Sequence, residues 1–170
     1  LLAAGLALAA AIALTASGVS RAQAGSIYQA TLEEPNQLTG EISTDELRRI
    51  LADGSALVVD SRKRSEYMTS HIPGAWNAAM EPGTPPEAVV SDIERLAGGD
   101  KTAAVVLYCN GPFCQASRRL GEQLVAAGFT NVRRYQIGLP VWRALGGTTE
   151  MELEALRRVA KGTFGVLMSL

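Results

Sequence analysis

Two apolar runs in the middle of the chain have the length and composition of buried strands. Residues 56–59 are followed by Asp60, and residues 103–108 are followed by Cys109. Continuous apolar runs of this length are typical of strands that are covered on both faces in a parallel sheet. Two further four-residue segments, at residues 75–78 and 132–135, also predict strands.

Segments with helical spacing of apolar residues separate these strands. Ser43 and Glu46 fit a capping box, in which each side chain bonds the other's backbone, ahead of a short helix that ends by Gly54. Further helices are predicted at residues 87–96, 117–127, 140–145 and 150–159. Strands that alternate with helices predict βαβ units, right-handed crossovers and a mostly parallel α/β sheet.

The first 24 residues have the pattern of a secretory signal peptide. Residues 1–14 are Leu, Ala and Ile with a single Gly, and Ala22-Gln23-Ala24 supplies the small residues of a cleavage site. The apolar run is shorter than the roughly 18 residues expected of a membrane span. We therefore expect cleavage after Ala24, a periplasmic or secreted protein, and no stable membrane insertion after cleavage. An uncleaved anchor is the alternative.

The patterns divide the chain into a signal peptide (1–24), a leader (25–42), an α/β domain (43–148) and a C-terminal helix and tail (149–170). No initiator Met or basic stretch precedes the first apolar run, so we expect the natural chain to begin further upstream. The apolar ending at 165–170 favours a truncated C-terminus, with an edge strand as the alternative.

Composition excludes several function classes. The 170 residues carry 16 Lys plus Arg against 17 Asp plus Glu, so no excess of positive charge is present to bind a nucleic acid. One His and two Cys are too few for a closed zinc site, and two Cys are too few for a disulfide scaffold. We therefore expect no metal, no cofactor and no nucleic-acid partner.

Residues 109–114, Cys-Asn-Gly-Pro-Phe-Cys, are the strongest candidate for chemistry. In open parallel sheets, sites form where the carboxyl ends of strands meet loops, and Cys109 leaves a buried strand toward the start of a helix. Unpaired amides and the positive end of the helix dipole lower the pKa of a thiol there, and the thiolate is the nucleophile. Gly111 allows the loop to curl with its amides inward. A buried structural cysteine before an ordinary turn is the alternative.

Several motifs resemble those of rhodanese-like domains in order and spacing. They cover roughly residues 41–148 and comprise Asp60-Ser61-Arg62, Glu66-Tyr67, His71-Ile72-Pro73-Gly74-Ala75, Tyr108-Cys109, Gly128-Phe129 with Asn131-Val132, and Gly138 with Trp142. The resemblance implies the rhodanese-like fold, a five-stranded parallel sheet flanked by helices. It also implies a sulfurtransferase that holds sulfane sulfur as a persulfide on Cys109. The donor would be a small sulfur-containing anion or a protein persulfide, and the acceptor a thiol.

The loop departs from the common pattern of that family. It lacks the basic residue often found there, and it carries Pro112 and a second thiol, Cys114. The resulting Cys-x-Gly-Pro-x-Cys loop is closer to a subgroup of rhodanese-like proteins, and it leaves the identity of the donor open. The residues between the two thiols would supply the loop walls and hydrogen-bond donors around Cys109: Asn110, Gly111, Pro112 and Phe113.

The candidate supporting residues are Asp60, Arg62, Arg118 and Trp142. We expect Asp60 and Arg62 to hold the loop after the first buried strand through an ion pair rather than to contact substrate. One of Arg118 and its neighbour Arg119 can aid an anion, although we expect at least one of them to lie on a solvated helix face. Trp142 is expected in the core or in the pocket wall.

Three function classes stay open. The first is the exported sulfurtransferase, the second is a thiol redox protein that uses a Cys109/Cys114 pair, and the third is a catalytically silent binding module. Retention of Cys109 disfavours the third class. A phosphatase is disfavoured because no Arg follows Cys109 within five residues. A Cys-His protease would need His71, which lies in a motif used mainly for structure, beside the thiol.

The second thiol suggests redox chemistry within the loop. A curled loop can bring the Cα atoms of Cys109 and Cys114 to the separation of about 4.4–6.8 Å that a disulfide needs. An exported protein also lacks cytosolic reductants. We hypothesise that Cys114 attacks oxidised or persulfidated Cys109, and that the internal disulfide protects Cys109 from irreversible oxidation. The alternative is that Cys114 packs in the core as a small hydrophobe.

Overall fold

The computed structural model of the chain describes residues 36–153. Within them, five strands form one sheet in the order β1-β5-β4-β2-β3, and all neighbouring strands are parallel. The strands are β1 (Gly40–Glu41), β2 (Leu57–Asp60), β3 (Trp76–Asn77), β4 (Val105–Tyr108) and β5 (Val132–Tyr135). The α/β class and the five-stranded parallel sheet are confirmed.

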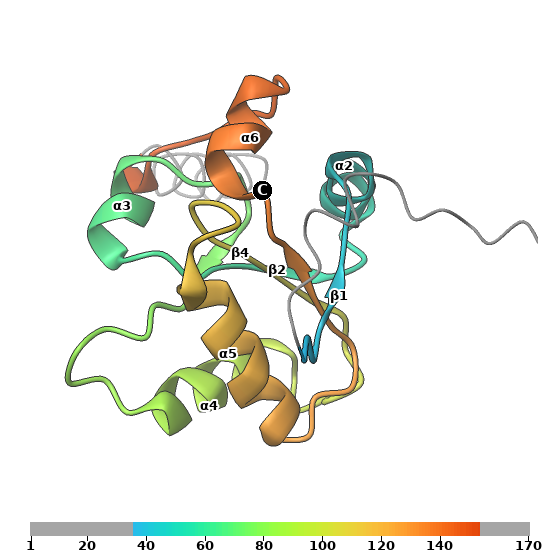
Figure 1. Cartoon of the computed structure of the whole chain (residues 1–170), viewed down its shortest axis with the longest axis vertical. Coiled ribbons are helices and arrows are strands. Elements are labelled where there is room, and N and C mark those ends of the chain that lie inside the picture. Colours follow the sequence, from blue (N-terminus) through green and yellow to red (C-terminus); the bar gives the residue numbers. More distant parts are fainter. Residues whose placement is uncertain (1–35, 154–170) are drawn as a thin grey trace, which may run out of the picture.

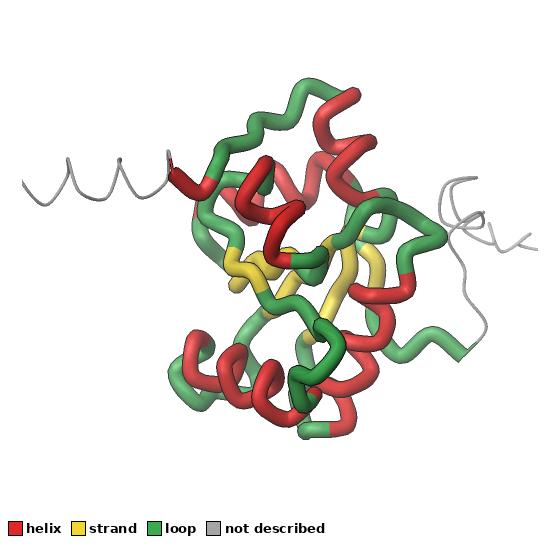
Figure 2. The backbone as a smooth tube through the Cα atoms, turned by 90° about the vertical axis from the view of Figure 1, so that its left-hand side faces the viewer, coloured by secondary structure: helices red, strands yellow, loops and turns green. Residues whose placement is uncertain are grey.

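Helices cover both faces of this sheet. They are α2 (Thr44–Asp53), α3 (Arg64–Thr69), α4 (Pro86–Leu96), α5 (Gln115–Ala126) and α6 (Gly138–Ala144). Figure 1 shows α4 and α5 on one side of the sheet and α2 and α6 on the other. The turned view in Figure 2 shows the strands as a layer between helices.

The side chains of β4 explain this arrangement, because they alternate between two hydrophobic clusters. Val106 and Tyr108 join a cluster with residues of α2 and α6. Val105 and Leu107 join a second cluster with residues of α4 and α5. All four side chains are fully buried, as expected for a central strand that is covered on both faces. The apolar run that predicted this strand therefore reflects burial on both sides.

The first helix begins with the predicted N-cap. The Ser43 hydroxyl accepts a hydrogen bond from the Glu46 backbone N–H at 3.2 Å, and Gly54 ends the helix in the left-handed conformation. The carboxylate of Glu46, which we expected to reach back to Ser43, forms an ion pair with Arg133 of β5. The ion pair with this cation thus replaces the hydrogen bond from the Ser43 backbone N–H to the Glu46 carboxylate that a capping box would contain.

Several elements differ from the sequence-based boundaries. β1 lies within the segment predicted as a leader, and it completes the sheet by pairing with β5. The polar stretch after β2 contains the short helix α3, and α5 begins at Gln115, two residues earlier than expected. Glu150, which the sequence predicts as the first residue of the last helix, instead forms an antiparallel bridge with His71.

The predicted signal peptide and most of the predicted last helix lie outside the described residues. Within residues 36–153, no helix combines the length and the hydropathy needed to cross a membrane.

Candidate active site

Cys109 lies at the carboxyl end of the central part of the sheet. It directly follows β4, which pairs with β2 on one side and with β5 on the other. Its side chain is 2% exposed. The Leu139 N–H donates to the Cys109 carbonyl oxygen at 2.9 Å, so the start of α6 fixes the backbone of the cysteine. The strand end and α6 together determine where the sulfur can point.

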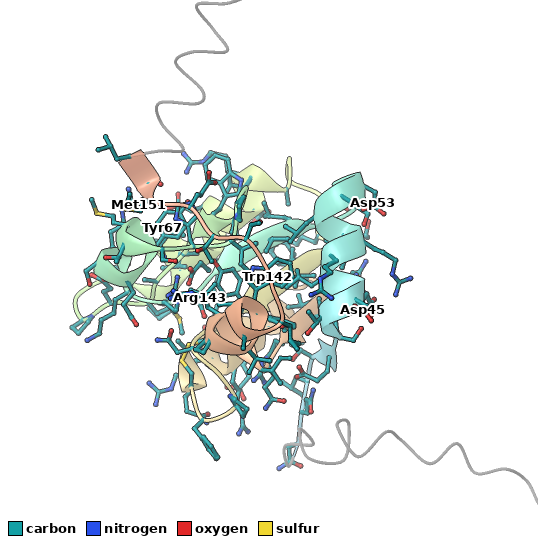
Figure 3. The ribbon with its side chains drawn as sticks, turned by 90° about the horizontal axis from the view of Figure 1, so that it is seen from above. Asp45, Asp53, Tyr67, Trp142, Arg143 and Met151 are labelled. Carbon is teal, nitrogen blue, oxygen red and sulfur yellow. A yellow bond between two sulfur atoms is a disulfide. The ribbon has the colours of Figure 1, made fainter. Side chains whose placement is uncertain are left out.

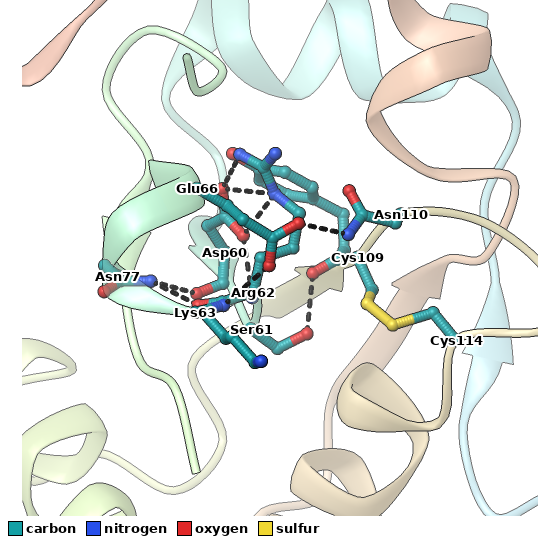
Figure 4. Close-up of a disulfide and its surroundings, with 10 residues drawn as sticks. Asp60, Ser61, Arg62, Lys63, Glu66, Asn77, Cys109, Asn110 and Cys114 are labelled. Atoms are coloured by element: carbon teal, nitrogen blue, oxygen red, sulfur yellow. Dashed lines mark hydrogen bonds and ion pairs between the residues drawn. A yellow bond between two sulfur atoms is a disulfide. The ribbon is translucent and has the colours of Figure 1, made fainter. Parts of the chain in front are cut away.

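The loop from Cys109 to Cys114 is compact and attached to a neighbouring helix. Gly111 has a φ of 139°, which favours glycine, and its carbonyl oxygen accepts a hydrogen bond from the Cys114 N–H at 3.0 Å. The Asn110 side-chain amide donates to the Glu66 carboxylate of α3 at 2.7 Å (Figure 4). The curled loop expected from Gly111 is therefore present.

Gly138, the first residue of α6, packs directly against the backbone of the loop. Its φ is 73°, and a Cβ on this residue would overlap the Gly111 nitrogen and the Cys109 carbonyl oxygen. Any larger residue would therefore push the loop away from α6. The close approach of two backbone segments makes glycine necessary at this position.

The two cysteines are joined by a disulfide, with a Cα–Cα distance of 6.2 Å (Figure 4). Cys114 is the N-cap residue of α5, so the start of this helix positions its sulfur. Because α5 begins at Gln115, the N-terminal end of the helix faces Cys114 more directly than it faces Cys109. The structure thus contains the internal disulfide that was considered from the sequence, and not a Cys114 side chain packed in the core.

A cavity of about 710 Å³ lies beside the disulfide. Its walls come from the loop after β2, the start of α3 and residues 79–82, together with Cys109, Asn110 and Cys114 of the active loop. Lys63 and Arg64 contribute cations, while Glu66 and Glu81 contribute carboxylates. The cavity is large enough to admit a small anion or an extended thiol to the two sulfur atoms.

Asp60 and Arg62 form a buried ion pair at the edge of this cavity. Arg62 Nη2 donates to Asp60 Oδ2 and to the Ser70 carbonyl oxygen, both at 2.6 Å. The guanidinium also lies 5.8 Å from the centre of the Tyr108 ring. Burial lowers the pKa of Arg62, but the hydrogen bonds and charge of Asp60 outweigh it, so the pKa of Arg62 is raised overall. These contacts are those expected of a pair that holds the loop after β2.

Two residues that we did not predict complete this support. The Asn77 side-chain amide donates to the carbonyl oxygens of Asp60 and Arg62, at 3.0 and 2.9 Å (Figure 4). The Ser61 hydroxyl donates to the Tyr108 carbonyl oxygen at 2.8 Å. Ser61 belongs to the Asp60-Ser61-Arg62 motif that the sequence already shows, although no role was predicted for it, whereas a lone Asn within a short predicted strand carries no comparable signal.

Other candidates lie away from the cavity. The Trp142 side chain extends from α6 toward α2 (Figure 3). Its Nε1 donates to the Thr148 carbonyl oxygen at 2.8 Å. Arg118 forms an ion pair with Glu122 along α5, at 3.0 Å. Phe113, which we expected in the loop wall, is 96% exposed, because the loop turns its side chain outward. Gly111, Pro112 and Phe113 are not among the residues that line the cavity.

His71 takes part in a buried cluster rather than in the site. Its ring stacks on Tyr67 at 3.8 Å, and Nδ1 lies 2.9 Å from the Tyr67 carbonyl oxygen. Its Nε2 lies 3.6 Å from Glu150 Oε1. Within the described part of the chain, no group of three or more His, Cys, Asp or Glu side chains could hold a metal ion.

A parallel sheet covered on both faces, with a cysteine in the loop after its central strand, defines an α/β domain whose candidate site is at the carboxyl end of the sheet. Comparison with family models identifies the family to which this domain belongs. The rhodanese-like domain model matches residues 43–145, so the chain belongs to the rhodanese-like domain family.

Similar proteins include both sulfur-transferring and regulatory members. The chain is 28% identical to a rhodanese-like domain from Anabaena sp., with a TM-score of 0.52 over 72% of this chain and 83% of that one. It is 25% identical to the thiosulfate sulfurtransferase of Pseudomonas aeruginosa, with a TM-score of 0.52 over 66% of this chain and 20% of that one. It is 32% identical to an HTH-type transcriptional regulator of Mycobacterium tuberculosis, over 62% of this chain and 42% of the regulator.

Proposed function

We propose that this protein is a sulfurtransferase that carries sulfane sulfur as a persulfide on reduced Cys109. The observation that carries the proposal is the position of Cys109, at the carboxyl end of β4 and on the wall of a cavity of about 710 Å³. The similarity to a thiosulfate sulfurtransferase supports the same reaction class. The donor is a small sulfur-containing anion or a protein persulfide, and the acceptor is a thiol.

The reaction needs one nucleophile and two exchanges at sulfur. The Cys109 thiolate attacks the sulfane sulfur of the donor, the sulfur–sulfur bond of the donor breaks, and the rest of the donor leaves with the electron pair. With thiosulfate, the leaving group is sulfite. An acceptor thiolate then attacks the outer sulfur of the persulfide and regenerates the Cys109 thiolate.

The disulfide form cannot begin this cycle, because both cysteine sulfurs are engaged. Reduction of the bond is therefore the first step toward activity. In the reduced protein, the ammonium of Lys63 on the cavity wall attracts an anionic donor toward Cys109.

The proposal is tested by thiocyanate formation from thiosulfate or polysulfide and cyanide, after reduction of the protein. Cys109→Ser should reduce turnover to the uncatalysed background, because a hydroxyl cannot hold a persulfide. Cys114→Ser keeps the nucleophile and should be active without prior reduction. Turnover by a folded Cys109→Ser protein, checked by circular dichroism, at the wild-type rate would overturn the proposal.

The disulfide favours a second candidate, a thiol redox protein that alternates between dithiol and disulfide. Such a protein would reduce a disulfide substrate without gaining sulfur from any donor, and this difference separates it from the sulfurtransferase. The similarity to a transcriptional regulator supports the third candidate, a binding module without turnover. A cysteine placed at the strand end beside a cavity disfavours it.

We also propose that the protein is exported with its first 24 residues removed. The support is the sequence alone, an apolar run followed by Ala22-Gln23-Ala24. A location outside the cytoplasm agrees with a disulfide, because exported proteins meet an oxidising environment.

A further inference from the structure

We propose that Cys114 makes this protein release sulfide from its own persulfide. The Cys114 thiolate attacks the inner sulfur of the Cys109 persulfide, forms the Cys109–Cys114 disulfide and expels hydrogen sulfide ion. The inference rests on the proposed persulfide at Cys109. It adds a second outcome for the carried sulfur, reduction to sulfide, beside transfer to an acceptor.

The disulfide itself shows that the attack is within reach. Cys114 Sγ is bonded to Cys109 Sγ, which is the atom that becomes the inner sulfur of the persulfide. The Cα–Cα distance of 6.2 Å lies inside the usual range for disulfides, and the strand and helix that hold the two residues are intact. The loop therefore brings the two sulfur atoms together without unfolding the sheet.

The burial of Cys109 makes attack by an external thiol and attack by Cys114 reach different sulfur atoms of the persulfide. Cys109 is 2% exposed, so an external thiol can approach its inner sulfur only through the cavity, where the outer sulfur of a persulfide would stand in the way. Cys114 is only half-buried, and it approaches the same atom from the start of α5. External acceptors should therefore take the outer sulfur, while Cys114 attacks the inner one.

The position of Cys114 also favours the attacking form of its thiol. As the N-cap residue of α5, it lies beside the unpaired amides of the first helical turn, and that turn carries no acidic residue. Amides and the positive end of the helix dipole stabilise a thiolate. Attack within one chain also avoids the entropy cost of bringing two molecules together.

The step is balanced in atoms and electrons. One sulfur–sulfur bond forms between the two cysteines, and the bond between Cys109 Sγ and the outer sulfur breaks. The electron pair of the broken bond leaves with the outer sulfur, which is reduced to sulfide while the two cysteine sulfurs are oxidised. A further cycle requires an external dithiol that reduces the disulfide.

A single-turnover experiment without oxygen tests the inference. The reduced wild type, Cys114→Ser and the control Gln115→Ala are loaded with polysulfide, separated from it at once and kept without acceptor. Gln115 is the exposed neighbour of Cys114, so its replacement keeps both thiols. The wild type and Gln115→Ala should release about one sulfide per loaded chain and end at the mass of the disulfide form. Cys114→Ser should retain its extra sulfur.

The outcomes separate this inference from the proposed function. If Cys114→Ser gains no sulfur although it is folded, the persulfide itself is contradicted and the inference fails with it. If Cys114→Ser gains sulfur and the wild type also keeps it, on either cysteine, without releasing sulfide, only the inference is overturned. Equal sulfide release by the wild type and Cys114→Ser would likewise overturn it.

Discussion

The cations around the cavity differ in how their charges are compensated. Arg62 is buried and bonded to Asp60, and Arg64 forms an ion pair with Glu152 at 3.2 Å. Lys63 is exposed at the N-cap of α3 and lines the cavity, where its ammonium can meet an incoming anion. The family's usual basic residue in the active loop is missing here, so we infer that Lys63 from a neighbouring element supplies this charge.

Replacing Lys63 should therefore weaken the use of an anionic donor. We expect Lys63→Gln to raise the KM for thiosulfate about 1.4- to fivefold at low salt, since exposed ion pairs are worth about 0.2–1 kcal/mol. The kcat should change less, because Lys63 does not touch the sulfur that reacts. The difference should shrink as salt screens the charge.

The matched control is Arg49→Gln, which removes the same charge from the exposed face of α2, outside the cavity lining. Steady-state kinetics with thiosulfate and cyanide at two ionic strengths supply the comparison. An equal rise in KM for both variants would show that Lys63 acts only through net charge.

At the scale of elements, the active loop is shaped by backbone packing against α6. Gly138→Ala would place a methyl group against the loop backbone in addition to the strain of a positive φ. We expect this variant to slow persulfide loading by about 10- to 100-fold, because small displacements of a reacting group have effects of that order. It should also lower the free energy of unfolding by more than about 1 kcal/mol.

Gly146→Ala is the control for that prediction. Gly146 has a φ of 81°, close to that of Gly138, but nothing lies within 4 Å of a Cβ there. It should lose stability of about 1 kcal/mol from the backbone strain and load sulfur at the wild-type rate. Loading rates measured by mass spectrometry, beside urea unfolding, would contradict the account if Gly138→Ala loaded as fast as Gly146→Ala.

Elements with a strong apolar pattern could be predicted from the sequence, and elements without one could not. β2 and β4 are mostly or fully buried, and their apolar runs identify them, whereas β5 has only Val132 and Tyr135 at its ends to mark it. β1 has only two residues, one exposed and one half-buried, so it has no pattern to detect. In α3, Tyr67 is the one buried residue, which leaves no helical stripe.

The strength of the local apolar pattern also explains which residues of the candidate site could be predicted from the sequence. Cys109 could be predicted because a buried strand leads directly to it. The position of Cys114 depends on the start of α5, and the first two residues of that helix, Gln115 and Ala116, carry no strong apolar signal. The outward turn of Phe113 depends on tertiary packing of the loop, which local sequence does not encode.

For the molecule as a whole, the cellular compartment of the protein should determine the redox state of the Cys109–Cys114 pair. A bacterium that expresses the chain with its first 24 residues should export it, and the mature protein should begin at Gly25. A matched chain that lacks residues 1–24 should stay in the cytoplasm, where the Cys109–Cys114 pair is kept reduced.

N-terminal sequencing and thiol labelling of cell fractions measure both properties. We expect a disulfide in the exported form and two labelled thiols in the retained form. Recovery of Leu1 on a cytoplasmic product of the full sequence would contradict the export prediction.

The central claim is that Cys109 carries sulfane sulfur, and the mass of one peptide tests it most directly. In Cys114→Ser, the tryptic peptide of residues 102–118 contains Cys109 as its one cysteine. After exposure to thiosulfate or polysulfide, this peptide should gain the mass of one sulfur atom, and cyanide should remove it as thiocyanate. A peptide that stays unmodified in the folded protein, with either donor in excess, would contradict the account.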